Sequence, residues 1–167
     1  TPDTSEIYFT RCGSDKQFEI QYCKIFRSRK KMDGTWETPL LVQIFTDIDE
    51  KVTDVILRDD TFNIGQPSIS ADGKFLYFVS NRPGGYGGKD IWISEIGKNG
   101  FGEPFNAGPI INTEYNEMSP FLHADNLTFY FASDGHIGMG EFDLFVSRRK
   151  NASQAWMSPK NMGYPIN

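Results

Sequence analysis

Two apolar segments of this chain are too continuous to be surface strands. Residues 75 to 79 read FLYFV and residues 128 to 132 read TFYFA, whereas a strand with one solvated face alternates apolar and polar positions. Both faces of these segments must therefore be covered by protein. Because no segment shows the spacing of an amphipathic helix, the pattern predicts an all-β fold with several strands buried on both sides.

The two segments belong to a longer internal repeat. Residues 119 to 147 reproduce residues 66 to 94 at an offset of 53 positions, and a more diverged copy lies at the N-terminus, where TPDTSEIYFTR corresponds to SADGKFLYFVS. Chance matching at average composition would not keep this register. The recurring pairs include Pro67 and Pro120, Asp72 and Asp125, Tyr77 and Tyr130, Phe78 and Phe131, and Asp90 and Asp143. Self-similarity at a fixed period is typical of a repeat architecture.

Each copy predicts four short strands. In the second copy we expect them at 68–70, 75–80 and 91–96, followed by a weak outer strand marked by an aromatic residue and a proline. This last pair recurs as Trp36 with Pro39, Phe101 with Pro104, and Trp156 with Pro159, and proline is tolerated on an edge strand. Four-stranded units covered on both faces by their neighbours are the blades of a β-propeller. We expect the aromatic residues of the second strands to pack between blades: Tyr8, Phe9, Tyr77, Phe78, Tyr130 and Phe131.

The expected blades lie at about residues 2–44, 66–112 and 117–167, the first of them incomplete. Propellers close with about four to eight blades, so we expect this segment to be part of a larger propeller. Between the first two blades, residues 45–63 form an insertion rich in aspartate. The insertion predicts an outer hairpin with an acidic, solvated face. A calcium site is the alternative, although the spacing matches no EF-hand loop.

Charge and motifs restrict the function. The net charge of −5, with no basic cluster beyond residues 27–31, argues against nucleic acid as a partner. No apolar run reaches the roughly 18 residues that span a bilayer, so we expect membrane contact only through other parts of a parent protein. The chain has no nucleophile elbow, HExxH, CxxC or phosphate-binding loop, and His123 and His136 occupy non-equivalent repeat positions. We therefore predict no catalytic residue, metal or cofactor.

The repeated aspartates favour a structural role. Ser80 with Asp90, and Ser133 with Asp143, resemble catalytic pairs, but they recur in successive repeats. An aspartate that opens the third strand can accept hydrogen bonds from the adjoining turn and hold the hairpin.

Turn chemistry accounts for the other repeated positions. Asp72 and Asp125 are assigned to the tight turn before the second strand. The glycines of residues 82–90 lie between two strands, and we interpret them as a wide hairpin with positive φ rather than a phosphate cradle.

The loops between second and third strands are the candidate partner-binding rim. Residues 82–88 and 135–141 should emerge on the same side, because equivalent positions in successive blades are related by rotation about one axis. The candidate contact residues are Arg82, Tyr86, His136 and Met139, of types common at interfaces. The alternative is that the glycines only permit a tight turn and that Tyr86 and Met139 cover their own blades.

The two cysteines are placed opposite each other by the alignment of repeats. Cys12 ends the second strand of the first copy and Cys23 begins the third. Cross-strand Cα separations of about 4.5 to 5.5 Å are within disulfide reach, and the bridge would stabilise the blade by about 2 to 3 kcal/mol. Two reduced, buried thiols are the alternative.

A family resemblance covers about residues 2–167. The blocks PSISADGKFLYFVSNRPGGYGGKDIWIS, AGPIINTEYNEMSP and DGHIGMGEFDLF resemble the WD40-like, TolB-related propeller repeats of outer-membrane-associated proteins from Bacteroidetes-type bacteria. In many of those proteins the propeller lies between tetratricopeptide repeats and an OmpA-like peptidoglycan-binding domain, and some belong to type IX secretion machinery. The resemblance implies a periplasmic envelope protein, lipid-anchored in its full-length form. That oxidising compartment favours the disulfide.

Two functions from different classes follow. The first is a non-catalytic scaffold whose loops bind envelope proteins, with glycan or peptidoglycan-associated components as further candidates. The second is the propeller domain of a hydrolase, gating a peptidase or processing a glycan. An OmpA-like domain in the parent protein would support the first function, and a nucleophile elbow the second.

Overall fold

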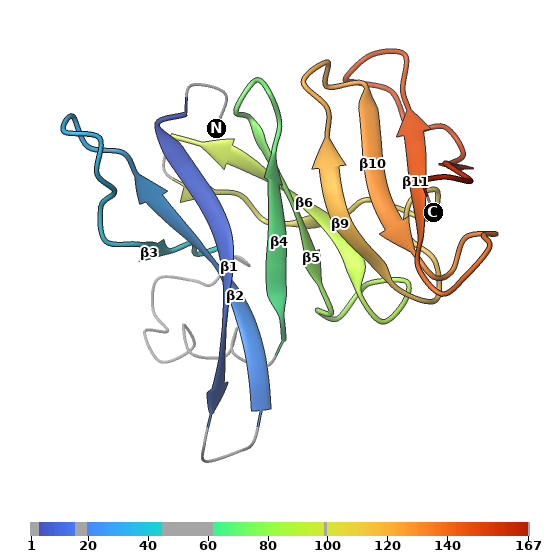
Figure 1. The fold of residues 1–167 in the computed structure, drawn as a ribbon, viewed down its shortest axis with the longest axis horizontal. Helices are drawn as coiled ribbons and strands as arrows, with labels where there is room; N and C mark the ends of the chain where they lie inside the picture. Colours follow the sequence, from blue (N-terminus) through green and yellow to red (C-terminus); the bar gives the residue numbers. More distant parts are fainter. Residues whose placement is uncertain (1–3, 16–19, 45–61, 99, 167) are drawn as a thin grey trace.

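All regular structure in the described residues is β-structure. The computed structural model describes residues 4–15, 20–44, 62–98 and 100–166, which form three antiparallel sheets lying side by side (Figure 1). The N-terminal sheet contains β1 (Glu6–Asp15), β2 (Ile20–Arg29) and β3 (Leu40–Leu41). The middle sheet contains β4 (Ile64–Ile69), β5 (Phe75–Ser80), β6 (Asp90–Gly97), β7 (Gly100–Phe101) and β8 (Phe105–Asn106). The C-terminal sheet contains β9 (Glu117–Leu122), β10 (Thr128–Ser133), β11 (Asp143–Arg148) and β12 (Lys160–Asn161). The all-β prediction is confirmed.

Within each sheet the chain runs from one edge to the other. The strand orders are β1-β2-β3, β4-β5-β6 with β7 and β8 both on β6, and β9-β10-β11-β12. The short strands β3, β8 and β12 begin directly after Pro39, Pro104 and Pro159. The proline signal therefore marks short outer strands, as the sequence predicts.

The innermost strand of the middle sheet is longer than predicted. It begins at Ile64 rather than Ser68, and Pro67 lies inside it. A bulge separates the pairings of Gly65 and Ser68, and Gln66 adopts a φ of 52° there. The same bulge recurs in β9, where Ser119 has a φ of 53° before Pro120. A bulge admits a proline because the ladder is already interrupted.

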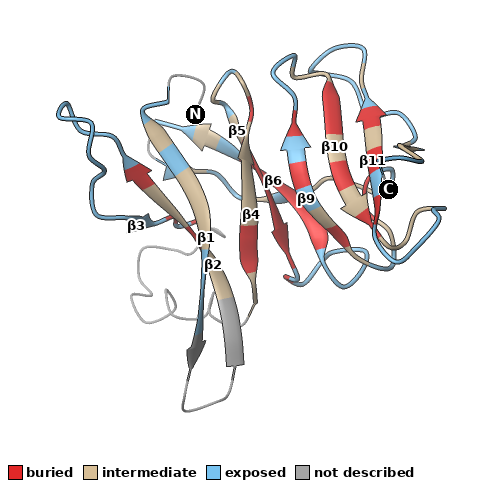
Figure 2. Ribbon diagram, viewed as in Figure 1, coloured by how far each residue is buried: buried red, intermediate tan, exposed pale blue. Residues whose placement is uncertain are grey.

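The middle sheet is buried on both faces, as the continuous apolar run predicts. Successive side chains of a strand point to opposite faces. In β5, Leu76 and Phe78 enter the core shared with the N-terminal sheet, whereas Tyr77 enters the core shared with the C-terminal sheet. Figure 2 shows the buried residues of β5, β6, β10 and β11 in red.

The prediction for the six aromatic residues holds for four of them. Tyr77, Phe78 and Phe131 are buried between sheets, and the half-buried Tyr8 packs against the core between the N-terminal and middle sheets. Phe9 and Tyr130 are half-buried and lie outside both cores. For Phe9 and Tyr130 the reason is position. Both face outward from a terminal sheet, and no further sheet in the described part of the chain covers them.

The turns before β5 and β10 are held by their aspartates. Asp72 accepts hydrogen bonds from the Ser70 hydroxyl at 2.6 Å and the Lys74 N–H at 3.2 Å, and the Ser70 bond lowers the Asp72 pKa. Gly73 follows with a φ of 70°.

Asp125 has the same role in the C-terminal sheet. It accepts the N–H groups of Leu127 and Thr128 at 2.7 and 2.8 Å, and the Leu127 bond is the main cause of its lowered pKa. Asn126 replaces glycine in the left-handed conformation, which asparagine tolerates. The structural prediction for both aspartates is confirmed.

A disulfide joins Cys12 and Cys23, as predicted. The two residues are direct partners in the pairing of β1 with β2, with a Cα separation of 4.0 Å. The hairpin that carries the bridge extends below the other two sheets in Figure 1. The bridge therefore ties together the two strands of a projecting hairpin.

Removing this bridge should weaken the hairpin measurably. We expect the double variant Cys12→Ala/Cys23→Ala to lose about 2 to 3 kcal/mol of unfolding free energy in urea titrations, because the closed loop no longer restricts the unfolded chain. A reductant should reproduce the loss in the wild type and change nothing in the double variant. Two free thiols found by alkylation and mass spectrometry of the non-reduced protein would contradict the bridge.

The acidic insertion falls largely outside the described residues. Of residues 45–63, the structure describes Phe62 and Asn63. The outer hairpin and its alternative, the calcium site, remain sequence predictions.

Candidate interaction site

The loop between β5 and β6 is anchored by the first residue of β6. The buried Asp90 carboxylate accepts the N–H groups of Tyr86 and Gly87, the second at 3.1 Å. It also accepts a hydrogen bond from the Asn106 amide in β8 at 2.7 Å. Asp90 thus connects the loop to the outer strand.

Asp143 does the same in the C-terminal sheet. Its carboxylate accepts the N–H groups of Met139 and Gly140, and the amide of Asn161 in β12 at 3.1 Å. The structural prediction for Asp90 and Asp143 is confirmed. It follows that neither aspartate is a free carboxylate for catalysis.

The glycines of these loops are needed mainly for close approach, which corrects the prediction of positive φ. Among residues 82–90 only Gly84 has a positive φ, of 88°. A Cβ at Gly85 would overlap the carboxylate of Asp90, and one at Gly138 would overlap that of Asp143. Each loop therefore folds tightly over its aspartate.

The segment between β8 and β9 lies between the two loops. The Gly88 N–H donates to the Tyr115 carbonyl at 2.7 Å, and a Cβ at Gly87 would overlap the same oxygen. On the other side, a Cβ at Gly135 would lie 3.1 Å from the Tyr115 Cβ. The three segments are interlocked, and all lie at the lower edge of the sheets in Figure 1.

A buried carboxylate supports this arrangement. Glu117 is fully buried and accepts the Thr113 N–H at 2.8 Å, the Thr113 hydroxyl at 2.7 Å and the Ser133 hydroxyl at 2.7 Å. It ties the segment before β9 to the end of β10. The sequence does not mark Glu117 as buried, because its repeat equivalent is Ile64 and a lone glutamate is normally exposed.

The interlocked loops present a cluster of exposed apolar side chains, which we call the apolar rim. Its members, with their exposed fractions, are Tyr86 (51%), Tyr115 (54%), Ile137 (98%), Met139 (65%) and Phe142 (46%). Two of them, Tyr86 and Met139, are predicted contact residues. Their backbone N–H groups are held by Asp90 and Asp143, so the rim is presented on fixed loops.

The other two predicted contact residues turn inward, which corrects their assignment to the rim. Arg82 is buried, with its guanidinium about 5 Å from the ring centres of Phe62, Phe78 and Trp92. Arg82 therefore covers the aromatic core between the N-terminal and middle sheets.

His136 has the corresponding position beside the core between the middle and C-terminal sheets. Its half-buried ring packs against Phe131 and Phe145 with centroid distances of 5.7 and 5.2 Å. Its Nε2 lies 2.9 Å from the Ile111 carbonyl. Like Arg82, His136 therefore covers the core beside its own sheet.

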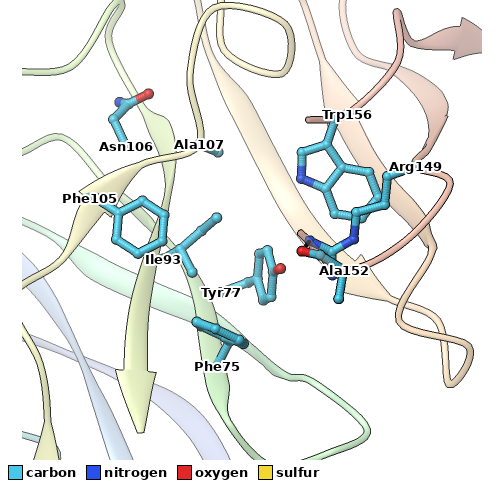
Figure 3. A pocket seen from close by; sticks show the side chains of 9 residues that line it. All are labelled: Phe75, Tyr77, Ile93, Phe105, Asn106, Ala107, Arg149, Ala152 and Trp156. Atoms are coloured by element: carbon cyan, nitrogen blue, oxygen red, sulfur yellow. Dashed lines mark hydrogen bonds between the residues drawn. The ribbon is translucent and has the colours of Figure 1, made fainter. Parts of the chain in front are cut away.

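A small pocket lies at the other end of the same sheets. Phe75 opens β5 and lines the pocket, whereas the rim loop follows Ser80 at the far end of β5. The cavity has a volume of about 230 Å³ (Figure 3). Its lining consists of Phe75, Tyr77, Ile93, Phe105, Asn106, Ala107, Arg149, Ala152 and Trp156.

The polar groups of this pocket are engaged in structure. Arg149 donates to the carbonyls of Asn126 and Ala152, and its guanidinium lies 4.4 Å from the ring centre of Trp156. Burial raises the pKa of the Tyr77 hydroxyl. Since ligand pockets measure about 300 to 1,000 Å³, this one suits a single apolar side chain better than a small molecule.

The described residues form neither a metal site nor a membrane-spanning helix. The part of the chain that the structure describes contains no group of three or more His, Cys, Asp or Glu side chains placed to hold a metal ion. Those residues also contain no helix with the length and apolarity to cross a bilayer.

Comparison with models of known protein families and with curated proteins finds no match.

Proposed function

We propose that this chain is a β-propeller segment that binds a protein partner through its apolar rim. The observation that carries the proposal is the gathering of exposed aromatic, Met and Ile side chains on three interlocked loops. Aromatic residues and methionine are enriched at protein interfaces, and a rigid backbone reduces the entropy lost on binding. The repeated sheets, each covering the next, support the propeller arrangement.

The engaged polar groups favour binding over hydrolysis. The Ser80 hydroxyl accepts the Arg82 N–H at 3.2 Å, and Ser133 donates to buried Glu117. Their strand partners Asp90 and Asp143 hold the loops. The side chains that resemble catalytic pairs therefore have structural partners, and a hydrolase function would have to come from another domain.

We place this binding module in the bacterial envelope, on the periplasmic side of the outer membrane. Two features support the location: the resemblance to WD40-like envelope repeats, and a disulfide, which is typical of oxidising compartments. The partners we propose are envelope proteins, including those that associate with peptidoglycan or its glycan.

Rim variants test the proposal by binding. In a pull-down from envelope extract followed by titration of the captured protein, the triple variant Tyr86→Ser/Ile137→Ser/Met139→Ser should bind at least about 30-fold more weakly, the effect of losing one interface hot spot. Its melting temperature should match the wild type, because the substituted side chains are exposed.

Two controls accompany this test. Met32→Ser removes an exposed apolar side chain from the turn after β2 in the N-terminal sheet and should bind like the wild type. Arg82→Ala should lower the melting temperature with little change in affinity. Wild-type affinity in the triple rim variant would refute the proposed binding site.

A further inference from the structure

The small pocket between the middle and C-terminal sheets has an apolar half and a polar half. Ile93 and Phe105 of the middle sheet line the apolar half (Figure 3). Trp156 and Arg149, from the segment that joins β11 to β12, line the polar half, and Tyr77 lies between the two halves. The pocket therefore suits a group that is apolar at one end and polar at the other.

The indole N–H of Trp156 is the exception among the polar groups of this pocket. Trp156 is only 8% exposed, and its ring is covered by Phe129 and by the Arg149 guanidinium, at 5.3 and 4.4 Å between centres. Its nitrogen faces the pocket in Figure 3 and has no hydrogen-bond acceptor among the described residues. A nearly buried donor is thus left for a group that enters the pocket.

The Tyr77 hydroxyl provides a second donor. It interacts with the guanidinium of Arg149, and because a guanidinium can only donate, the hydroxyl accepts there and keeps its own hydrogen. Arg149 forms no ion pair with a carboxylate of the described residues. Asp72, the acid whose charge acts on Tyr77, is hydrogen-bonded within its own turn. A ligand therefore meets two donors and a positive charge.

The repeat shows which group accepts from such a tyrosine. In the N-terminal sheet the equivalent of Tyr77 is Tyr8, and the equivalent of Phe75 is Glu6. The Tyr8 hydroxyl donates to the Glu6 carboxylate at 3.0 Å, and that carboxylate also accepts from Arg29 at 2.7 Å. In the pocket Phe75 replaces this glutamate and brings no acceptor. The missing partner of the pocket donors is therefore a carboxylate.

We propose that the pocket binds the C-terminal residue of a peptide that ends in an apolar side chain. The terminal carboxylate accepts from the Trp156 N–H and the Tyr77 hydroxyl beside the charge of Arg149, and the side chain lies against Ile93 and Phe105. A terminal residue is the part of a peptide in which one residue combines an apolar side chain with a carboxylate.

Size and position agree with this occupant. An apolar cavity of about 150 Å³ binds benzene, and this pocket has a volume of about 230 Å³, which leaves room for a ring and a carboxylate. The pocket lies at the opposite end of β5 from the loop that carries part of the apolar rim. The site is therefore independent of the binding site proposed on the rim.

N-acetylphenylalanine is the probe, because it has the aromatic side chain and the free carboxylate of a C-terminal residue. In a titration followed by proton–nitrogen correlation NMR, the indole resonance of Trp156, identified by its loss in Trp156→Phe, should shift and saturate with a Kd on the order of 1 mM. N-acetylphenylalanine methylamide has a neutral amide in place of the carboxylate and should bind about 10-fold more weakly.

Variants assign the binding to this pocket. Phe105→Ala removes part of the apolar wall at a half-exposed position, and Trp156→Phe removes the donor but keeps an aromatic ring. Each should weaken probe binding about 10-fold, measured from the backbone amide resonance of Ala107. Circular dichroism melting should show both variants folded. The triple rim variant should bind the probe like the wild type, so a failure of the rim proposal leaves this result unchanged.

Three results would overturn the proposal. The first is a Trp156 indole resonance that does not shift at probe concentrations about 10-fold above the expected Kd. The second is a methylamide that binds as tightly as the free acid, which would mean that the carboxylate is not recognised. The third is wild-type affinity in Phe105→Ala, which would place the probe outside the pocket even if Trp156→Phe were unfolded.

Discussion

Phe131→Ala should destabilise the chain by about 3 to 5 kcal/mol, the usual cost of removing a fully buried aromatic side chain. The Phe131 ring lies between those of Phe129 and Phe145, with centroid distances of 5.8 and 5.9 Å, and His136 covers its edge. These neighbours belong to paired strands and to an anchored loop, so they cannot collapse into the space left behind. The lost unfolding free energy should therefore include the free energy of transferring the ring out of water and the cost of the cavity that it leaves in the core.

Urea titration followed by tryptophan fluorescence measures this loss, because Trp156 stacks on Phe129 in the same core. Phe105→Ala is the matched control, since Phe105 is 51% exposed and should cost less than about 1 kcal/mol. Equal losses in the two variants would contradict the assignment of Phe131 to the core.

Glu117→Ala should cost about 3 to 4 kcal/mol, although it removes no apolar surface. The carboxylate accepts three hydrogen bonds in a fully buried site, and a buried donor left without an acceptor costs about 1 to 3 kcal/mol. The hydroxyls of Thr113 and Ser133 can rotate toward other acceptors, but the Thr113 N–H cannot. The loss should therefore fall below the sum for three donors.

Glu117→Gln separates the loss of an acceptor from the loss of volume. Glutamine keeps the shape and one acceptor oxygen, which can still accept the Thr113 N–H, but its NH₂ group replaces the other acceptor. We therefore expect Glu117→Gln to lose less unfolding free energy than Glu117→Ala in the same urea titration. Exposed Glu114 provides the control, and Glu114→Ala should change stability by less than about 0.5 kcal/mol. A Glu117→Gln variant that loses as much as Glu117→Ala would show that both carboxylate oxygens are required.

Local patterns and the repeat were sufficient for much of the fold. The continuous apolar run at 75–79 predicted a strand covered on both faces, because no other environment tolerates it. The alignment of copies placed Cys12 opposite Cys23. It also assigned Asp90 and Asp143 to their loops, since a residue that recurs in two successive copies is expected to stabilise its own copy. These predictions depend on contacts within one repeat.

The residues that were misplaced depend on contacts between repeats. Arg82 is charged and follows a strand, which favours an exposed position, yet its guanidinium is covered in part by Phe62 from the segment before β4. Tyr130 repeats Tyr77, but the sheet that covers Tyr77 has no equivalent beside Tyr130 in the described residues. Glu117 has an apolar repeat counterpart, Ile64, so the repeat does not indicate a carboxylate there. Whether such side chains are buried depends on a neighbour that the local sequence does not specify.

The stacking of whole sheets also shapes how this chain loses its structure. Each described sheet is built from consecutive strands and meets its neighbours mainly through its two faces, so its stability is approximately the sum of an internal contribution and one contribution for each covered face. Within the described residues, the terminal sheets have one covered face and the middle sheet has two. Opening should therefore begin at either end and reach the middle sheet last, so that unfolding resembles the fraying of a short stack.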